Sequence, residues 1–120
     1  MHKYVIIALS FLAVSLLSYF AIGEDAVKAD PEHYTVVLEN DKVRVIKIQY
    51  GPGEKSVMHT HGPNVSIAMT ENKVRMNLPD GTSEEYTLKV GEPMWSDQEE
   101  HLPENLSDSP LEVILVEIKE

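Results

Sequence analysis

Apolar and polar residues alternate over short stretches from Tyr34 to the end of the chain, and turn residues separate these stretches. The clearest case is 74–78, in which three apolar residues alternate with an arginine and an asparagine. A period of two is typical of a β-strand with one buried face. No stretch of this region shows the 3.6-residue period of an amphipathic helix. The pattern therefore predicts an all-β domain.

Seven to nine short strands, joined by loops of two to six residues, predict a sandwich or a small barrel. The last strand is apolar on both faces except at Glu112 and Glu117, so we expect it to be central. A shift of phase at Val45 and Ile46 predicts a β-bulge there. The predicted strands are 34–38, 42–50, 56–60, 65–70, 74–78, 83–88, 93–95, 101–106 and 111–119.

The N-terminal segment 1–23 has the pattern of a secretory signal peptide. Lys3 precedes a mostly apolar run that ends at Phe20, and small residues follow. We expect cleavage after Gly23, with Ala26 as a second candidate; an uncleaved membrane anchor is the alternative, because the run is just long enough to cross a bilayer. The segment 24–33 is expected to form a linker or an N-terminal arm before a domain at 34–120. The predicted location is secreted or periplasmic.

The composition limits the choice of partners. A chain of 120 residues with 42% apolar residues can bury one core, which predicts one domain. The formal net charge of −10 repels phosphate backbones and anionic lipids, so no nucleic-acid partner and no membrane contact beyond the signal segment are expected. There is no cysteine, so no disulfide contributes to stability.

Two histidines have the spacing of metal ligands. His59 and His61 are two residues apart in a predicted strand, so both imidazoles point to one side of the sheet. A third histidine, His101, follows about forty residues later. The alternative is that these residues are ordinary polar groups near the mouth of a barrel. No Ser-His-Asp or Cys-His arrangement and no Gly-rich phosphate loop is present, so no catalytic residue is assigned.

The arrangement of Gly53 before the His-Thr-His sequence, and of Gly91 and Asn105 around His101, resembles the two motifs of the cupin superfamily. In that family, three or four residues follow the second histidine of the first motif, and a glutamate comes next. This chain has Val65 and Ser66 there. The resemblance covers nearly all of 34–120 and implies a small double-stranded β-helix, the cupin or jelly-roll-like barrel.

The resemblance further implies that His59, His61 and His101 hold one divalent transition metal, which could be Fe, Mn, Ni, Zn or Cu. Three neutral imidazoles leave the ion its full charge, which favours an anionic small-molecule ligand. One hypothesis is a dioxygenase or isomerase of a small anionic or enol-type molecule. The other is a non-catalytic barrel that binds a small ligand, a metal or a protein partner. We also expect a homodimer, because cupin-like barrels often dimerise and a second copy would cover an edge strand.

The sequence also predicts the burial or exposure of four further side chains. Trp95 is predicted to pack in the core; the alternative is that it closes one wall of a ligand pocket together with Met94. Met69 and Met76 are predicted to fill gaps on inward faces. His33 is expected to be solvated.

Acidic residues surround His101 in the sequence. They are expected to be a solvated loop, or alternatively to supply a general base or a partner that orients the imidazole. These residues are Asp97, Glu99, Glu100 and Glu104.

Overall fold

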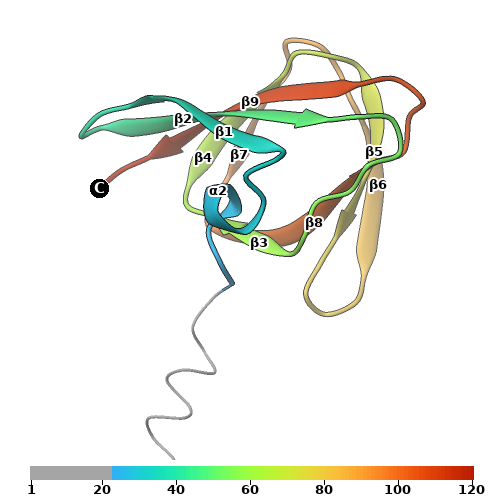
Figure 1. The fold of residues 1–120 in the computed structure, drawn as a ribbon, viewed down its shortest axis with the longest axis horizontal. Helices are drawn as coiled ribbons and strands as arrows, with labels where there is room; N and C mark the ends of the chain where they lie inside the picture. Colours follow the sequence, from blue (N-terminus) through green and yellow to red (C-terminus); the bar gives the residue numbers. More distant parts are fainter. Residues whose placement is uncertain (1–22) are drawn as a thin grey trace, which may run out of the picture.

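Two antiparallel sheets enclose the interior of the protein in the computed structural model, which describes residues 23–120 (Figure 1). The five-stranded sheet has the order β1-β2-β9-β4-β7, and the four-stranded sheet has the order β3-β8-β5-β6. The prediction of an all-β barrel is confirmed. The strands are β1 (Tyr34–Glu39), β2 (Val43–Tyr50), β3 (His59–His61), β4 (Asn64–Ala68), β5 (Asn72–Asn77), β6 (Ser83–Leu88), β7 (Pro93–Ser96), β8 (Glu99–Asn105) and β9 (Leu111–Ile118).

Strand β9 is central, as its apolar sequence predicts. It pairs with β2 along its whole length and with β4 on its other side. Its buried positions alternate, and Leu111, Val113 and Leu115 point into the core. The next inward position is Glu117, which is 8% exposed. An acidic side chain therefore lies in a row of buried apolar ones.

The core lies between the sheets, and both contribute to it. Ile46, Ile48 and Tyr50 come from β2, and Val74 comes from β5. Burying a side chain of this size contributes roughly 1.5–3 kcal/mol, so these contacts hold the two sheets face to face. The packing of this core thereby fixes the positions of the inward-facing side chains on the same strands.

The predicted bulge lies on the neighbouring strand. Val36 pairs with Ile46 and Leu38 pairs with Val45, so the extra residue is Val37 of β1. The prediction of a bulge within β2 is wrong, because β2 keeps a regular alternation with Ile46 inward and Val45 on the other face. The apolar residues on both faces of β2 shift the apparent phase of the sequence without breaking the strand.

The segment 24–33, for which a linker or an arm is expected, contacts the barrel. It contains the short helix α2 (Ala26–Ala29), capped by Asp25, whose carboxylate accepts a hydrogen bond from the Val27 amide at 3.2 Å. Ala26 is fully buried, and the Thr60 amide donates to the Glu24 carbonyl at 2.9 Å. Helix α2 thus lies against β3 (Figure 1). The expected signal segment, apart from Gly23, lies outside the described residues.

Three burial predictions are wrong. Trp95 is 58% exposed because it lies on β7, an edge strand, and its indole donates to Asp97 at 3.2 Å. Met69 is 49% exposed. His33 is not solvated: its side chain is 14% exposed, and its two ring nitrogens contact Asp30 and Glu54. The part of the chain that the structure describes contains no helix that could span a membrane.

Candidate metal centre

The three predicted histidines converge between the sheets. His59 and His61 lie on one face of β3, and the pairing of β3 with β8 places His101 directly opposite His59. All three are buried, with exposed fractions of 0%, 2% and 7%. One ring nitrogen of each lies within 4.8 Å of the others, which makes a group that could hold a metal ion.

A hydrogen bond at its Nδ1 atom fixes the orientation of the His59 ring. This atom lies 2.8 Å from the Val57 carbonyl oxygen, which can only accept, so Nδ1 carries the proton. Ser56 Oγ lies 3.2 Å from the same nitrogen and donates to Asp30 at 2.6 Å. The Nε2 atom of His59 is therefore unprotonated, and its lone pair points toward the other histidines.

His61 is held in the same way by Glu117 of β9. Glu117 Oε2 lies 3.3 Å from His61 Nδ1, and Glu117 Oε1 accepts from Arg44 at 2.7 Å. Arg44 is also paired with Asp25 at the start of α2. An acceptor behind Nδ1 fixes the proton there, as carboxylates do behind metal-bound histidines. The lone pair of His61 Nε2 then faces that of His59 Nε2 at 3.1 Å, an arrangement that a cation between them stabilises.

The third imidazole has an unsatisfied nitrogen. His101 Nε2 is buried and has no hydrogen-bond partner among the described residues. Leaving such an atom without a partner costs about 1–3 kcal/mol, and a metal ion removes this cost by accepting the lone pair. Three imidazole nitrogens are a donor set that suits Zn, Cu, Fe and Ni. The residues present therefore fit a divalent transition metal.

The environment keeps two of the imidazoles neutral. Burial lowers the pKa of His101 to about 3, helped by the nearby His61 and His59. Burial and the proximity of His61 lower the pKa of His59 to about 4. Burial raises the pKa of Glu117, but hydrogen bonds with His61 and Arg44 outweigh it and hold that pKa below its usual value. Neutral imidazole is the form that binds metals, so these residues are ready ligands at neutral pH.

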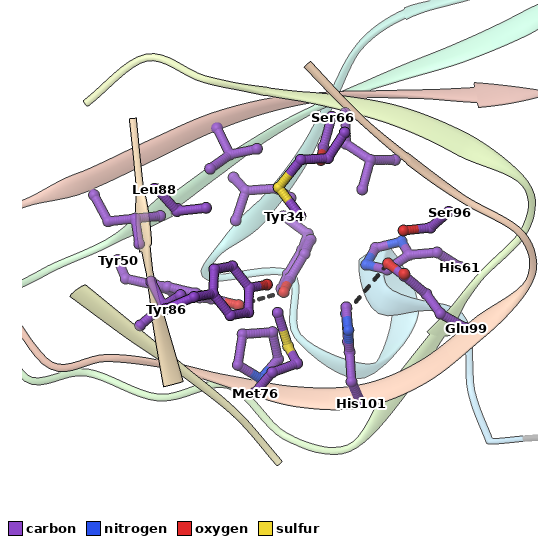
Figure 2. Close-up of a pocket in the computed structure, with 17 residues that line it drawn as sticks. Tyr34, Tyr50, His61, Ser66, Met76, Tyr86, Leu88, Ser96, Glu99 and His101 are labelled. Atoms are coloured by element: carbon purple, nitrogen blue, oxygen red, sulfur yellow. Dashed lines mark hydrogen bonds and ion pairs between the residues drawn. The ribbon is translucent and has the colours of Figure 1, made fainter. Parts of the chain in front are cut away.

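A cavity of about 140 Å³ adjoins the histidines, and Figure 2 shows His61 and His101 at one end of it and Tyr50 and Tyr86 at the other. Tyr34 lies between them, with its ring centroid 5.7 Å from that of His61. The hydroxyls of Tyr34 and Tyr50 are hydrogen-bonded to each other. The remaining lining is largely apolar, and no lysine or arginine of residues 23–120 takes part in it. Apolar side chains from both sheets contribute, among them Ile48, Val74, Met76, Leu88 and Leu115.

Of the four acidic residues near His101 in the sequence, only Glu99 reaches the cavity (Figure 2). Glu104 pairs with Arg75, and Asp97 accepts from Trp95. Glu100 lies on the opposite face of β8, where it pairs with Thr60.

Sequence reasoning missed Ser56, Asp30 and Arg44. Asp30 and Arg44 lie far from the His-Thr-His sequence, and Ser56, three residues before His59, is a residue type that carries no metal-site signal of its own. Glu117 did carry a signal, since it is an acidic residue at an inward position of an otherwise apolar strand.

Asn105, which the cupin motif places after His101, has a structural role. It is fully buried, and its Nδ2 donates to the carbonyls of Gly51 and Ser109 at 3.0 and 2.9 Å. Its Oδ1 accepts from the Ser107 amide at 3.1 Å. One side chain thus ties the 51–54 turn to the 107–109 loop.

Comparison with solved structures identifies related folds. A cupin domain from Bordetella pertussis Tohama I superposes with a TM-score of 0.68 at 28% identity, covering 72% of this chain and 92% of that one. An RmlC-like cupin family protein with a double-stranded β-helix fold from Methanocaldococcus jannaschii has a TM-score of 0.57 at 17% identity, covering 82% and 90%. A cupin superfamily protein from Desulfitobacterium hafniense DCB-2 has a TM-score of 0.54 at 7% identity, covering 72% and 76%. No family model and no curated protein matches the sequence.

Proposed function

Since the chain is a small protein of the cupin superfamily, we propose that it holds one divalent transition metal through His59, His61 and His101 and presents it to a small molecule in the adjoining cavity. The observation that supports this proposal most directly is the orientation of the ring nitrogens of the three histidines. His59 and His61 direct unprotonated Nε2 atoms at one point, and His101 Nε2 lies buried there without a partner among the described residues.

The cavity indicates the size and character of the ligand. Its volume is about 140 Å³. A dry apolar cavity of about 150 Å³ holds a molecule the size of benzene, so a ligand of similar bulk fits here. The apolar walls exclude water and favour a small apolar body. Because the described part of the chain contributes no lysine or arginine to the lining, the oxygen that carries the ligand's negative charge is expected at the histidine end.

The reaction class we favour is dioxygenation or isomerisation of an enol-type or carboxylate substrate. A bound divalent metal would act as a Lewis acid that stabilises an enolate or carboxylate oxygen. The chain's own residues orient the imidazoles, keep them unprotonated on the inward side, and exclude water from the ligand. A ligand-binding barrel without catalysis is the second candidate.

Elemental analysis tests the metal site. The full-length chain would be expressed with a C-terminal affinity tag that contains no histidine, and the protein compared with a His59→Ala/His101→Ala variant. We expect about one metal per chain, lost in the variant. Absence of metal from a folded wild-type protein would refute the proposal. Oxygen uptake with enol and carboxylate substrates then separates the enzyme from the ligand-binding barrel.

We further propose that the protein is exported and that cleavage follows Gly23. The alternative cut after Ala26 would remove Asp25, which caps α2 and pairs with Arg44, together with the fully buried Ala26. Cleavage after Gly23 keeps both. Intact mass of the protein from a periplasmic extract tests this, and a mature chain that begins at Val27 would contradict it.

A further inference from the structure

We propose that Glu99 supplies a fourth, carboxylate ligand to the same metal, in place of the glutamate that this chain lacks at Val65 and Ser66. This inference rests on the proposed metal site. In this arrangement the carboxylate comes from β8, two residues before His101, instead of from the strand that follows the His-Thr-His sequence.

The strand pairing puts Glu99 on the correct face. Glu99 and His101 are two residues apart on β8, so their side chains share the inward face. Across the ladder Glu99 is paired with His61, just as His101 is paired with His59. The four side chains therefore form a square on two neighbouring strands, with histidine at three corners and glutamate at the fourth.

The distances suit a shared ion. Ligand atoms bound to one metal at about 2.0–2.2 Å are separated by roughly 3–4 Å, depending on the angle at the metal. Glu99 Oε1 lies 3.7 Å from His101 Nε2, and the two Nε2 atoms of His59 and His61 are 3.1 Å apart. The first distance is too long for a hydrogen bond. Each separation falls in this range. The three histidine nitrogens form the group whose members all lie within 4.8 Å of one another, and Glu99 adjoins that group through His101.

Glu99 also differs from every other acidic residue near the site in having no competing partner. Among the described residues, the only basic side chain close to its carboxylate is the neutral His101, 3.7 Å away, and the Glu99 side chain is 25% exposed and lines the cavity. Glu117 is close too, but it contacts Nδ1, on the outer side of His61, and is engaged by Arg44. Figure 2 shows Glu99 between His61 and His101 at the end of the cavity.

A bound Glu99 changes which ligand the site prefers. Three neutral imidazoles and one carboxylate reduce the charge of a divalent centre to plus one, so a single anionic oxygen neutralises it. Since no lysine or arginine from the described part of the chain lines the cavity, a second negative charge on the ligand would have no partner. The site is therefore built for a monoanion, such as one carboxylate or one enolate, and discriminates against dicarboxylates.

Metal affinity in a charge-neutralised variant tests the proposal. Glu99→Gln keeps the size of the side chain and removes its charge, and Glu100→Gln is the matched control on the opposite face of the same strand. Dissociation constants for Mn²⁺ and Zn²⁺ would be measured by competition with a chelator on the full chain, purified and stripped of metal. We expect Glu99→Gln to weaken Mn²⁺ binding about ten- to a hundredfold, because Mn²⁺ prefers carboxylate ligands, and to weaken Zn²⁺ binding less. The control should stay within about twofold of the wild type.

Two further readouts identify direct ligation. The visible absorption spectrum of the Co²⁺ form should change in Glu99→Gln and not in Glu100→Gln, and added acetate should restore Mn²⁺ affinity to Glu99→Ala. Wild-type affinity with an unchanged Co²⁺ spectrum in Glu99→Gln would overturn the inference and leave the three-histidine site standing. A wild-type protein that binds neither Mn²⁺ nor Zn²⁺ would overturn both proposals.

Discussion

Glu117 Oε2 lies 3.3 Å from His61 Nδ1, so the central strand of one sheet orients a histidine that belongs to the other sheet. Arg44 on β2 holds the other oxygen of the same carboxylate. This contact joins the histidine group to the most extensively paired strand of the barrel. A change in Glu117 should therefore act on the site through the orientation of His61.

Replacing Glu117 by glutamine should weaken metal binding about ten- to a hundredfold, which is the usual effect of losing a carboxylate behind a metal-bound histidine. The glutamine cannot hold the proton on Nδ1 as firmly, because it lacks the negative charge. Chelator competition measures the effect. Glu112→Gln is the control, since Glu112 lies on the same strand and its side chain accepts a hydrogen bond from the exposed Gln49. Equal affinities in the two variants would show that Glu117 does not support the site.

Removal of metal should lower thermal stability. Zn²⁺ present at about a hundred times its dissociation constant stabilises a folded protein by about 2.7 kcal/mol, which raises Tm on the order of 10 °C in a domain of this size. Differential scanning calorimetry with and without a chelator measures the shift. The His59→Ala/His101→Ala variant should show no shift, and a shift equal to that of the wild type would place the ion elsewhere.

His33 should make stability depend on pH near neutrality. Burial lowers its pKa, but hydrogen bonds with Asp30 and Glu54 outweigh burial and hold the pKa above the ordinary 6.5. Because the folded state binds the proton more tightly, the stabilisation is complete below pH 6.5 and is lost as pH rises through the raised pKa.

Urea titrations of metal-free protein between about pH 6 and about pH 8.5 test this effect. The advantage of the wild type over His33→Gln should be largest at the acidic end and should shrink as pH rises. Comparison of the two proteins cancels the titration of the other histidines, which both retain. A constant or growing difference across this range would contradict the assigned pairing with Asp30 and Glu54.

Replacing Asn105 by alanine should destabilise the fold by about 2–4 kcal/mol, because the Gly51 carbonyl and the Ser107 amide lose a side-chain partner and the Ser109 carbonyl loses one of two. Asn77→Ala is a suitable comparison. Asn77 is only partly buried and donates a hydrogen bond to the Leu102 carbonyl, so we expect a loss of about 1 kcal/mol. Chemical denaturation measures both. Equal losses would mean that the 51–54 turn and the 107–109 loop do not depend on Asn105.

The sequence by itself determined the strands and the shared face of two histidines. Alternation is a local property, since the pleat sends every second side chain to the same side, and it correctly predicted β9 as central and placed His59 and His61 together. It could not place Trp95, because an aromatic residue in a strand has the same local pattern at an edge as in the core.

Tertiary structure decided which strands are neighbours, and with that the composition of the site. His101 comes opposite His59 only because β3 pairs with β8, and Glu117 reaches His61 only because the two sheets pack face to face. Glu99 lies beside the histidines for the same reason as His101, because both residues are on β8, which pairs with β3. These contacts join residues far apart in the chain. They depend on the packing of the whole core, which no local period of the sequence encodes.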